Sequence, residues 1–231
     1  MEKTQPCDMK IGKPEREYEV YLFDADGTLL NTVDLVVESY MHVFVLFKDL
    51  IPGNREYSRK DVASLMGIPL QVQMEHYFGS LTADKMEEVC NAYTSYQQNI
   101  YKDYLKPFPG VRETLRELKL AGKKCGIVTS RRIGTAGLYA EATGIAEYID
   151  VLITPEDTAK HKPEPEPVLE AMKRLGSSPD NTVFVGDALF DVRSGNAAGV
   201  DTVFVNWSHN DVSELEESPT YVIDTMQDLL K

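Results

Sequence analysis

Two aspartates, Asp24 and Asp26, directly follow an apolar run in the stretch EVYLFDADGTLLNT (residues 19–32) and directly precede a glycine. On an extended backbone, side chains two residues apart point to the same side, so the two carboxylates face the same way. Two like charges held close together repel each other unless a cation or a shared proton lies between them. The pair therefore predicts a site that binds a cation or moves a proton.

Three further polar segments carry the other candidate residues: VTS (128–130), HKPEP (161–165) and GDALFD (186–191). Together with Asp24 and Asp26 they supply several carboxylates, one hydroxyl and one ammonium group. A cluster of oxygen ligands alone suits Mg²⁺, a hard ion that keeps several waters and bridges to phosphate. Thr129 and the backbone N–H of Ser130 could bind phosphate oxygens, and Lys162 could neutralise both the nucleophile and the substrate. The set predicts a phosphoryl-transfer site.

Regular elements must position these segments. Apolar runs of strand length recur at residues 18–23, 123–129, 150–154, 181–186, 201–206 and 220–223, and segments with helical spacing lie between them at residues 111–122, 134–144, 165–176 and 189–199. Strands that alternate with helices on short connections are typical of a parallel α/β sheet with right-handed crossovers. Ligands bind past the carboxyl ends of such strands, where three of the four polar segments fall. The HKPEP segment follows a loop instead.

Residues 32–106 interrupt this alternation. They contain no comparable strand run, and helical spacing appears over residues 33–47, 58–66 and 82–105. We predict a helical insertion that is hinged near residues 31–33 and again at KPFPG (106–110). Because it leaves from the end of the strand that carries Asp24, it would overhang that carboxylate, where a lid belongs.

Composition and charge restrict the class of protein. The 231 residues are 42% hydrophobic and 26% charged, enough to bury a core. A formal net charge of −13 disfavours partners such as nucleic acid or an anionic membrane. Neither a signal peptide nor an apolar segment of membrane-spanning length is present, so we expect a cytoplasmic protein. Three widely separated cysteines, Cys7, Cys90 and Cys125, lack the spacing of a zinc site.

The four ordered segments DADGTLL, GIVTS, HKPEPEP and GDALFDVRSGNAAG resemble the four motifs of the haloacid dehalogenase superfamily, over roughly residues 18–206. The helical insertion resembles the α-helical (C1-type) cap of the phosphoglycolate phosphatases and their pyrophosphatase relatives. The resemblance implies a Rossmann-like parallel-sheet core at residues 17–31 and 107–231 and a cap at residues 32–106. Residues 1–16, which are polar and broken by Pro6, Gly12 and Pro14, should form a loose tail.

The resemblance also implies the catalytic roles. Asp24 attacks phosphorus to form an aspartyl-phosphate, while Asp26 protonates the leaving oxygen and then activates the hydrolytic water. Mg²⁺ is held by Asp24, the backbone carbonyl of Asp26, and Asp187. Asp191 either ligates the ion through water or orients Lys162.

Further residues are expected around the phosphate and the rest of the substrate. Gly27 would let the backbone pass close to the phosphate with a positive φ. Gly67, in MGIPL (66–70), resembles a cap loop that enters the active site, although a helix-ending turn explains it equally well. Either Arg131 or Arg132 could face a substrate carboxylate, with solvent exposure as the alternative.

The leading hypothesis is an Mg²⁺-dependent phosphatase that acts on a small phosphorylated metabolite such as phosphoglycolate, or on pyrophosphate. A sugar-phosphate mutase is the first alternative, but those relatives typically carry Glu-Asp where this chain has Gly186–Asp187. Asp26 argues against a dehalogenase, and no cap lysine can be assigned for a phosphonatase. A signalling receiver domain is shorter and lacks the insertion, and a degenerate scaffold would not keep every reactive residue. The sequence leaves the exact substrate and the oligomeric state open.

Overall fold

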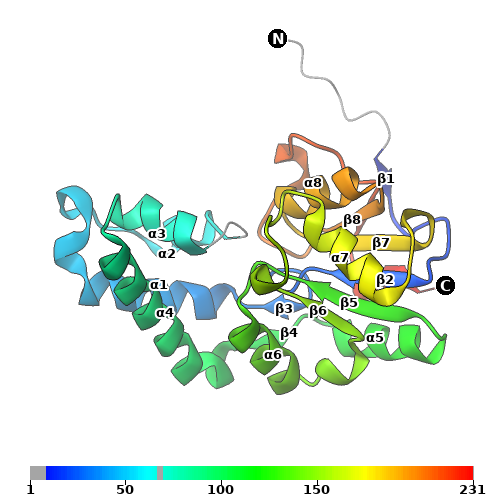
Figure 1. Cartoon of the computed structure of the whole chain (residues 1–231), viewed down its shortest axis with the longest axis horizontal. Coiled ribbons are helices and arrows are strands. Elements are labelled where there is room, and N and C mark those ends of the chain that lie inside the picture. The colour runs from blue at the N-terminus through cyan, green and yellow to red at the C-terminus, as the bar shows by residue number, and fades with distance from the viewer. Residues whose placement is uncertain (1–8, 67–69, 231) are drawn as a thin grey trace, which may run out of the picture. The chain divides into compact units, whose positions relative to one another are not determined.

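The computed structural model describes residues 9–66 and 70–230, and the chain divides into two compact units (Figure 1). The first unit runs to Leu30 and resumes at Pro107, and the second spans Asn31–Lys106. Two-residue strands, β3 (Leu30–Asn31) and β4 (Lys106–Pro107), pair with each other where the chain passes between the units.

A parallel sheet of seven strands forms the centre of the first unit, in the order β1–β9–β8–β7–β2–β5–β6. Its strands are β1 (Lys10–Ile11), β2 (Val20–Phe23), β5 (Lys124–Val128), β6 (Val151–Ile153), β7 (Thr182–Gly186), β8 (Asp201–Val205) and β9 (Tyr221–Ile223). Six of them coincide with the apolar runs of the sequence. The predicted α/β class with a parallel, Rossmann-like sheet is confirmed.

The seventh strand, β1, was not expected. Lys10 and Ile11 lie within the segment predicted to be a loose tail, but they pair in parallel with Tyr221 and Val222. The backbone N–H of Gly12 also donates to the carbonyl of Val222 at 2.7 Å. Two residues are too short to show an alternating pattern, and their pairing satisfies the otherwise open edge of β9. The loose tail therefore does not extend through Lys10–Ile11.

Helices pack on both faces of this sheet (Figure 1). They are α5 (Val111–Leu120), α6 (Ile133–Ala142), α7 (Glu166–Leu175) and α8 (Leu189–Ala198), with short 3₁₀ turns at Ala146–Tyr148, Pro155–Asp157, Pro179–Asn181, Val212–Glu214 and Met226–Leu229. The side chains of β2 alternate between the faces, and Val20 and Leu22 share a buried cluster with α7 and with Phe184 of β7. Burial on both faces explains why these strands read as continuous apolar runs.

The second unit is helical and has its own aromatic core. It contains α1 (Val33–Leu46), α2 (Arg59–Ala63), α3 (Leu70–Phe78) and α4 (Ala83–Tyr104), with 3₁₀ turns at Lys48–Leu50 and Pro52–Asn54. Tyr40 is fully buried, with its ring centroid 5.0 Å from that of Tyr77 and 4.8 Å from that of Tyr93. Helix α3 was not predicted, because its buried face includes the polar Gln73 and so shows a weak apolar period.

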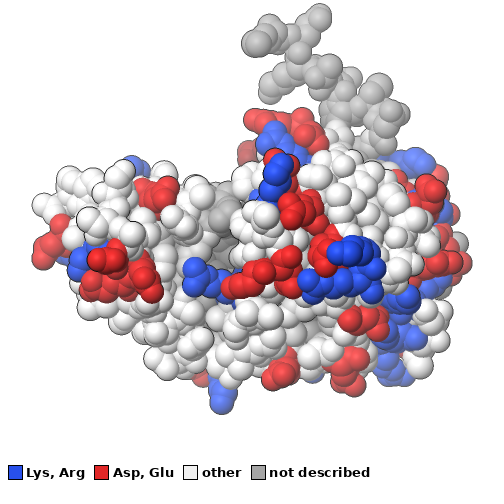
Figure 2. Space-filling view, viewed as in Figure 1, with Lys and Arg blue, Asp and Glu red and all other residues white. Residues whose placement is uncertain are grey.

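Charged side chains of both signs lie on the surface. Figure 2 shows acidic and basic groups interspersed over the face in view, and several are paired, as Arg174 is with Asp157 and Glu170 at 2.8 Å. The 22-residue helix α4 buries Met86, Val89, Tyr93 and Gln97 along one face, and its charged residues lie in its first two turns and its last turn. Among the helices of the described residues, none has both the length and the apolar character that crossing a membrane requires.

Candidate active site

The register of three neighbouring strands brings the predicted segments to one edge of the sheet. Phe23 of β2 lies opposite Ile127 of β5 and Val185 of β7. Asp24 follows Phe23 directly, and its backbone N–H donates to the carbonyl of Val185 at 2.8 Å. Parallel strands end at the same edge, so the residues that follow β5 and β7, beginning with Thr129 and Asp187, come to the same level as Asp24.

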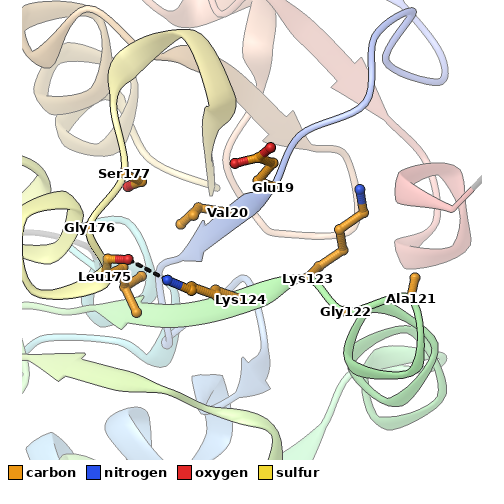
Figure 3. A pocket seen from close by; sticks show the side chains of 9 residues that line it. All are labelled: Glu19, Val20, Ala121, Gly122, Lys123, Lys124, Leu175, Gly176 and Ser177. Atoms are coloured by element: carbon orange, nitrogen blue, oxygen red, sulfur yellow. Dashed lines mark hydrogen bonds between the residues drawn. The ribbon is translucent and has the colours of Figure 1, made fainter.

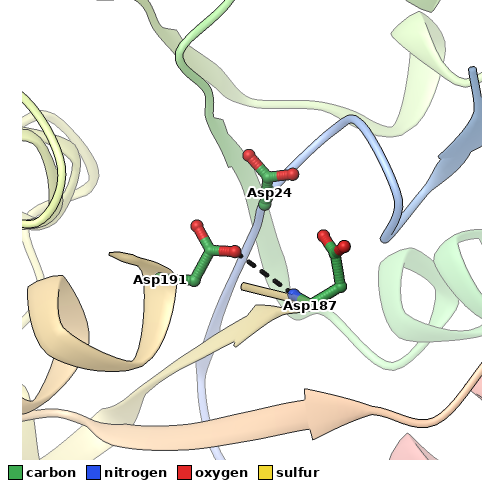
Figure 4. A group of neighbouring side chains, drawn as sticks. All are labelled: Asp24, Asp187 and Asp191. Carbon is green, nitrogen blue, oxygen red and sulfur yellow. Dashed lines mark hydrogen bonds between the residues drawn. The ribbon is translucent and has the colours of Figure 1, made fainter. Parts of the chain in front are cut away.

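Three buried aspartates meet at this edge (Figure 4). One carboxylate oxygen each of Asp24, Asp187 and Asp191 lies within 4.8 Å of the others, and the three residues are 6%, 3% and 3% exposed. Asp191 is in the first turn of α8, where its Oδ2 accepts hydrogen bonds from the backbone N–H groups of Asp187 at 3.2 Å and Ala188 at 3.0 Å. These bonds hold Asp191 against the start of its own helix.

Lys162 joins two of these carboxylates. Its Nζ donates to Oδ1 of Asp24 at 2.5 Å and to Oδ1 of Asp191 at 2.7 Å, and it reaches the carbonyl of Val128 at 3.3 Å. Burial alone would lower the pKa of Lys162, but the carboxylates of Asp191 and Asp24 together raise the pKa by more than burial lowers it. The pKa of Lys162 therefore lies above its ordinary value. Lys162 is therefore a buried, protonated cation that orients both aspartates.

The cluster remains short of positive charge. Three carboxylates and one ammonium leave a formal charge of −2 when all are ionised. Burial raises the pKa of Asp24 to about 7, although Lys162 opposes the shift. Burial, with the charges of Asp24 and Asp191, also raises the pKa of Asp187 well above its ordinary value. Without a further cation the site takes up protons.

The donor set fits Mg²⁺. The cluster offers carboxylate oxygens and no nitrogen or sulfur ligand, which is the preference of a hard divalent ion, and its unbalanced charge is negative. The side chain of Asp26 is not part of this cluster. Its expected contribution to the metal is through its backbone carbonyl, and that remains a prediction.

Asp26 instead forms a bidentate ion pair with Arg131. The Nε and Nη2 atoms of Arg131 donate to Oδ2 and Oδ1 of Asp26 at 2.9 and 2.6 Å. The guanidinium carbon also lies 4.5 Å from the ring centroid of Tyr139, a fully buried side chain of α6. Arg131 is thus turned towards the aspartates, whereas Arg132 is exposed.

Gly27 and two side chains place Asp187. The φ of Gly27 is +91°, and a Cβ at this position would lie 2.3 Å from Oδ2 of Asp187. Thr28 donates from Oγ1 to Oδ1 of Asp187 at 3.1 Å. Asn210 donates to both the carbonyl and Oδ2 of Asp187, at 2.9 and 3.1 Å. The carboxylate of Asp187 is therefore held from three sides.

Asn210, Trp207 and Tyr139 are contacts that the sequence reasoning missed. Trp207 donates from Nε1 to the carbonyl of Thr28 at 3.1 Å. Trp207 and Asn210 follow β8, which pairs with β7, so they lie at the same edge as the aspartates. The sequence carries a signal for Trp207 and Asn210, since both have polar side-chain groups and closely follow the apolar run at residues 201–206.

The structure describes two of the remaining predicted residues, Thr129 and Ser130, but not Gly67. Thr129 is buried, and its Oγ1 accepts a hydrogen bond from the backbone N–H of Arg131 at 3.1 Å, which leaves its hydroxyl hydrogen to donate. Ser130 is half-buried beside it. Gly67 lies outside the described residues. Thr129 and Ser130 therefore stay candidates for binding phosphate oxygens.

A cleft of about 230 Å³ lies elsewhere on the first unit (Figure 3). It is at the amino ends of β2 and β5, and its lining includes Val20 and Lys124. Lys124 donates to the carbonyl of Leu175 at 2.6 Å, and Lys123 pairs with Glu17 at 3.2 Å. Because both lysines already have partners and the cleft is at the opposite edge of the sheet, we place the active site at the aspartates.

Known proteins resemble the chain over most of its length. Residues 21–205 match the family model described as haloacid dehalogenase-like hydrolase. The chain is 38% identical over 210 residues to a Clostridium perfringens protein provisionally named pyrophosphatase PpaX, covering 90% of this chain and 94% of that one. It is 34% identical to the pyrophosphatase PpaX of Bacillus velezensis, covering 94% and 96%.

A solved structure shares the fold. The crystal structure of a Lactobacillus plantarum protein, provisionally named a phosphoglycolate phosphatase, superimposes with a TM-score of 0.80 at 22% identity, covering 92% of this chain and 98% of that one. The prediction of an enzyme, a hydrolase of the phosphatase type, is confirmed by the family match and the sequence relatives. The chain belongs to the haloacid dehalogenase-like hydrolase family.

Proposed function

We propose that this protein is an Mg²⁺-dependent phosphatase that hydrolyses pyrophosphate or a small phosphorylated metabolite such as phosphoglycolate, through a phosphorylated Asp24. The observation that carries the proposal is the buried group of Asp24, Asp187 and Asp191 with Lys162 inserted between two of them. A structural ion pair needs one carboxylate for one ammonium, whereas this site keeps two carboxylates in excess, and their burial is costly unless a cation joins them.

Asp24 acts as the nucleophile in this proposal. One of its carboxylate oxygens attacks phosphorus, forming an O–P bond while the bond from phosphorus to the leaving oxygen breaks. Lys162 holds Oδ1 of Asp24 and so fixes the direction of the carboxylate. Thr129 and the backbone N–H of Ser130 bind the non-bridging phosphate oxygens, which carry charge in the transition state.

Asp26 moves the protons. Its carboxyl group gives a proton to the leaving oxygen in the first step, and its carboxylate then takes a proton from water, whose oxygen attacks the phosphorus and releases Asp24. Asp24 and Asp26 are two residues apart at the end of β2, so both reach the same phosphate. Bound Mg²⁺ supplies positive charge that offsets the repulsion between the phosphate and the carboxylates.

The substrate is proposed from the relatives and from the helical unit. The relatives are named for pyrophosphate hydrolysis, and the structural neighbour for phosphoglycolate. Both compounds are small and carry a second anionic group. Residues 32–106 are proposed to act as a cap that selects between such substrates, since in this architecture the core supplies chemistry and the cap supplies selection.

Phosphate release from a panel of compounds tests the proposal. Pyrophosphate, phosphoglycolate, a hexose phosphate and an aryl phosphate are incubated with the protein in Mg²⁺ or in excess chelator. We expect release that requires Mg²⁺. Isomerisation of the hexose phosphate without release would identify a mutase instead, and no turnover of any compound would contradict the proposal.

Asp24→Asn tests the nucleophile. The side chain keeps its shape but loses its charge, so turnover should be abolished while the fold is retained. Asp180→Asn is the matched control, because Asp180 is an exposed aspartate of the same unit. Wild-type rates in Asp24→Asn would refute covalent catalysis by this residue.

A further inference from the structure

The ion pair between Arg131 and Asp26 places a guanidinium beside the residue that is proposed to protonate the leaving group. Arg131 is confined, with 11% of its side chain exposed, by two hydrogen bonds to Asp26 on one side and by the ring of Tyr139 on another. A guanidinium held in this way has a fixed direction and a fixed charge.

The reach of Arg131 follows from these contacts. If Asp26 touches the leaving oxygen, a group hydrogen-bonded to both carboxylate oxygens of Asp26 lies beside the leaving group. The planar fork of an arginine binds a carboxylate and a phosphate with the same bidentate geometry. Arg131 can therefore exchange the carboxylate of Asp26 for an anionic group of the substrate.

We propose that Arg131 determines specificity for substrates whose leaving group carries its own negative charge, such as the second phosphate of pyrophosphate or the carboxylate of phosphoglycolate. This inference rests on the proposed function and narrows it to one chemical class. When the anionic leaving group takes the guanidinium, Asp26 is released next to the leaving oxygen. A neutral leaving group offers no such exchange, so Asp26 stays engaged with Arg131.

A matched pair of substrates isolates this effect. Phosphoglycolate and 2-hydroxyethyl phosphate are both two-carbon phosphate monoesters, and they differ in having a carboxylate or a hydroxymethyl group beyond the ester carbon. For wild-type protein in Mg²⁺ we expect kcat/KM to be about 10- to 100-fold higher for phosphoglycolate, the range of a hydrogen bond to a charged group. Pyrophosphate is assayed alongside as the second anionic probe.

Arg131→Gln should bring the ratio of the two kcat/KM values close to one, by lowering the rate with phosphoglycolate and pyrophosphate more than that with 2-hydroxyethyl phosphate. Arg131→Lys keeps the charge but not the fork, and should give an intermediate ratio. This second variant retains a cation opposite Asp26, so it tests the inference even if Arg131→Gln folds poorly. Arg132→Gln removes the neighbouring exposed charge and should leave the ratio unchanged.

The outcomes of these assays distinguish a failure of the inference about Arg131 from a failure of the proposed phosphatase function. A ratio that stays at the wild-type value in Arg131→Gln, while both rates fall equally, would make Arg131 a purely structural partner of Asp26. A wild-type protein that releases phosphate from both esters without preference would also overturn the inference and leave the phosphatase intact. Failure to hydrolyse any of the three compounds in Mg²⁺ would refute the proposed function, and the inference with it.

Discussion

Replacing Gly27 with alanine should disable the site by displacing Asp187, without replacing any of the reactive side chains. The added Cβ would lie 2.3 Å from Oδ2 of Asp187, and real Cβ atoms essentially never approach closer than 3.0 Å. Opening the contact from 2.3 to 3.0 Å moves the carboxylate or the backbone by at least 0.7 Å. Asp187 cannot turn away freely, because Thr28 and Asn210 hold both of its carboxylate oxygens.

The expected size of the effect follows from this displacement. A misplacement of about 1 Å can lower a catalytic rate about 100-fold, so we expect kcat for phosphate release to fall by about that factor. The positive φ of +91° adds backbone strain, which costs about 1–3 kcal/mol for a residue other than glycine. At about 2–4 °C per kcal/mol for a chain of this size, Tm should fall by several degrees.

Gly122→Ala separates the contact from the strain. Gly122 also has a positive φ, of +75°, but a Cβ there would meet nothing within 4 Å. We expect Gly122→Ala to lower Tm by a similar amount and to keep the wild-type kcat and Mg²⁺ response. The assay is phosphate release as a function of Mg²⁺ concentration, with Tm measured by thermal denaturation. If Gly27→Ala retained kcat and the Mg²⁺ response as the control does, Asp187 would not be the constrained ligand that we describe.

Three further predictions concern the same cluster. Lys162→Met removes the buried cation from between Asp24 and Asp191, and should lower the free energy of unfolding by about 3–5 kcal/mol in the absence of Mg²⁺; a urea unfolding curve like that of the wild type would show that Lys162 does not stabilise the carboxylates. Asn210→Ala removes two hydrogen bonds to Asp187 and should raise the Mg²⁺ concentration for half-maximal activity about tenfold or more, whereas the control Asn206→Ala, in the same loop but exposed, should not. The raised pKa of Asp24, about 7 against an ordinary 3.8, and that of Asp187 mean that the folded protein binds more protons than the unfolded chain in this range. Their ionisation therefore lowers the stability of the folded protein as the pH rises from about 4 to 7. Mg²⁺ binds the ionised carboxylates, so the increase in Tm caused by Mg²⁺ should grow from about pH 5 to about pH 8; a pH-independent increase would contradict the pKa shifts of Asp24 and Asp187.

Local patterns were sufficient for most elements of the fold. Six strands of the main sheet and helices α5 to α8 coincide with apolar runs and helical spacing, because a strand buried on both faces and a helix buried on one leave periodic signatures. The patterns failed where the element was too short or its buried face too polar. Strand β1 has two residues, and α3 buries Gln73.

The candidate site was predictable in its residue types but not in its pairings. The sequence by itself determined that carboxylates and a hydroxyl follow strand ends, because strand, turn and acidic residue are neighbours in the chain, and that a lysine lies in a loop nearby. Only the tertiary structure decided that Lys162 lies between Asp24 and Asp191, and that Arg131 binds Asp26 across 105 positions of sequence. It also decided that Thr28 and Asn210 hold Asp187. Such pairings depend on the order and register of the strands, which bring distant loops to one edge, and local spacing carries no information about which loop will be the neighbour.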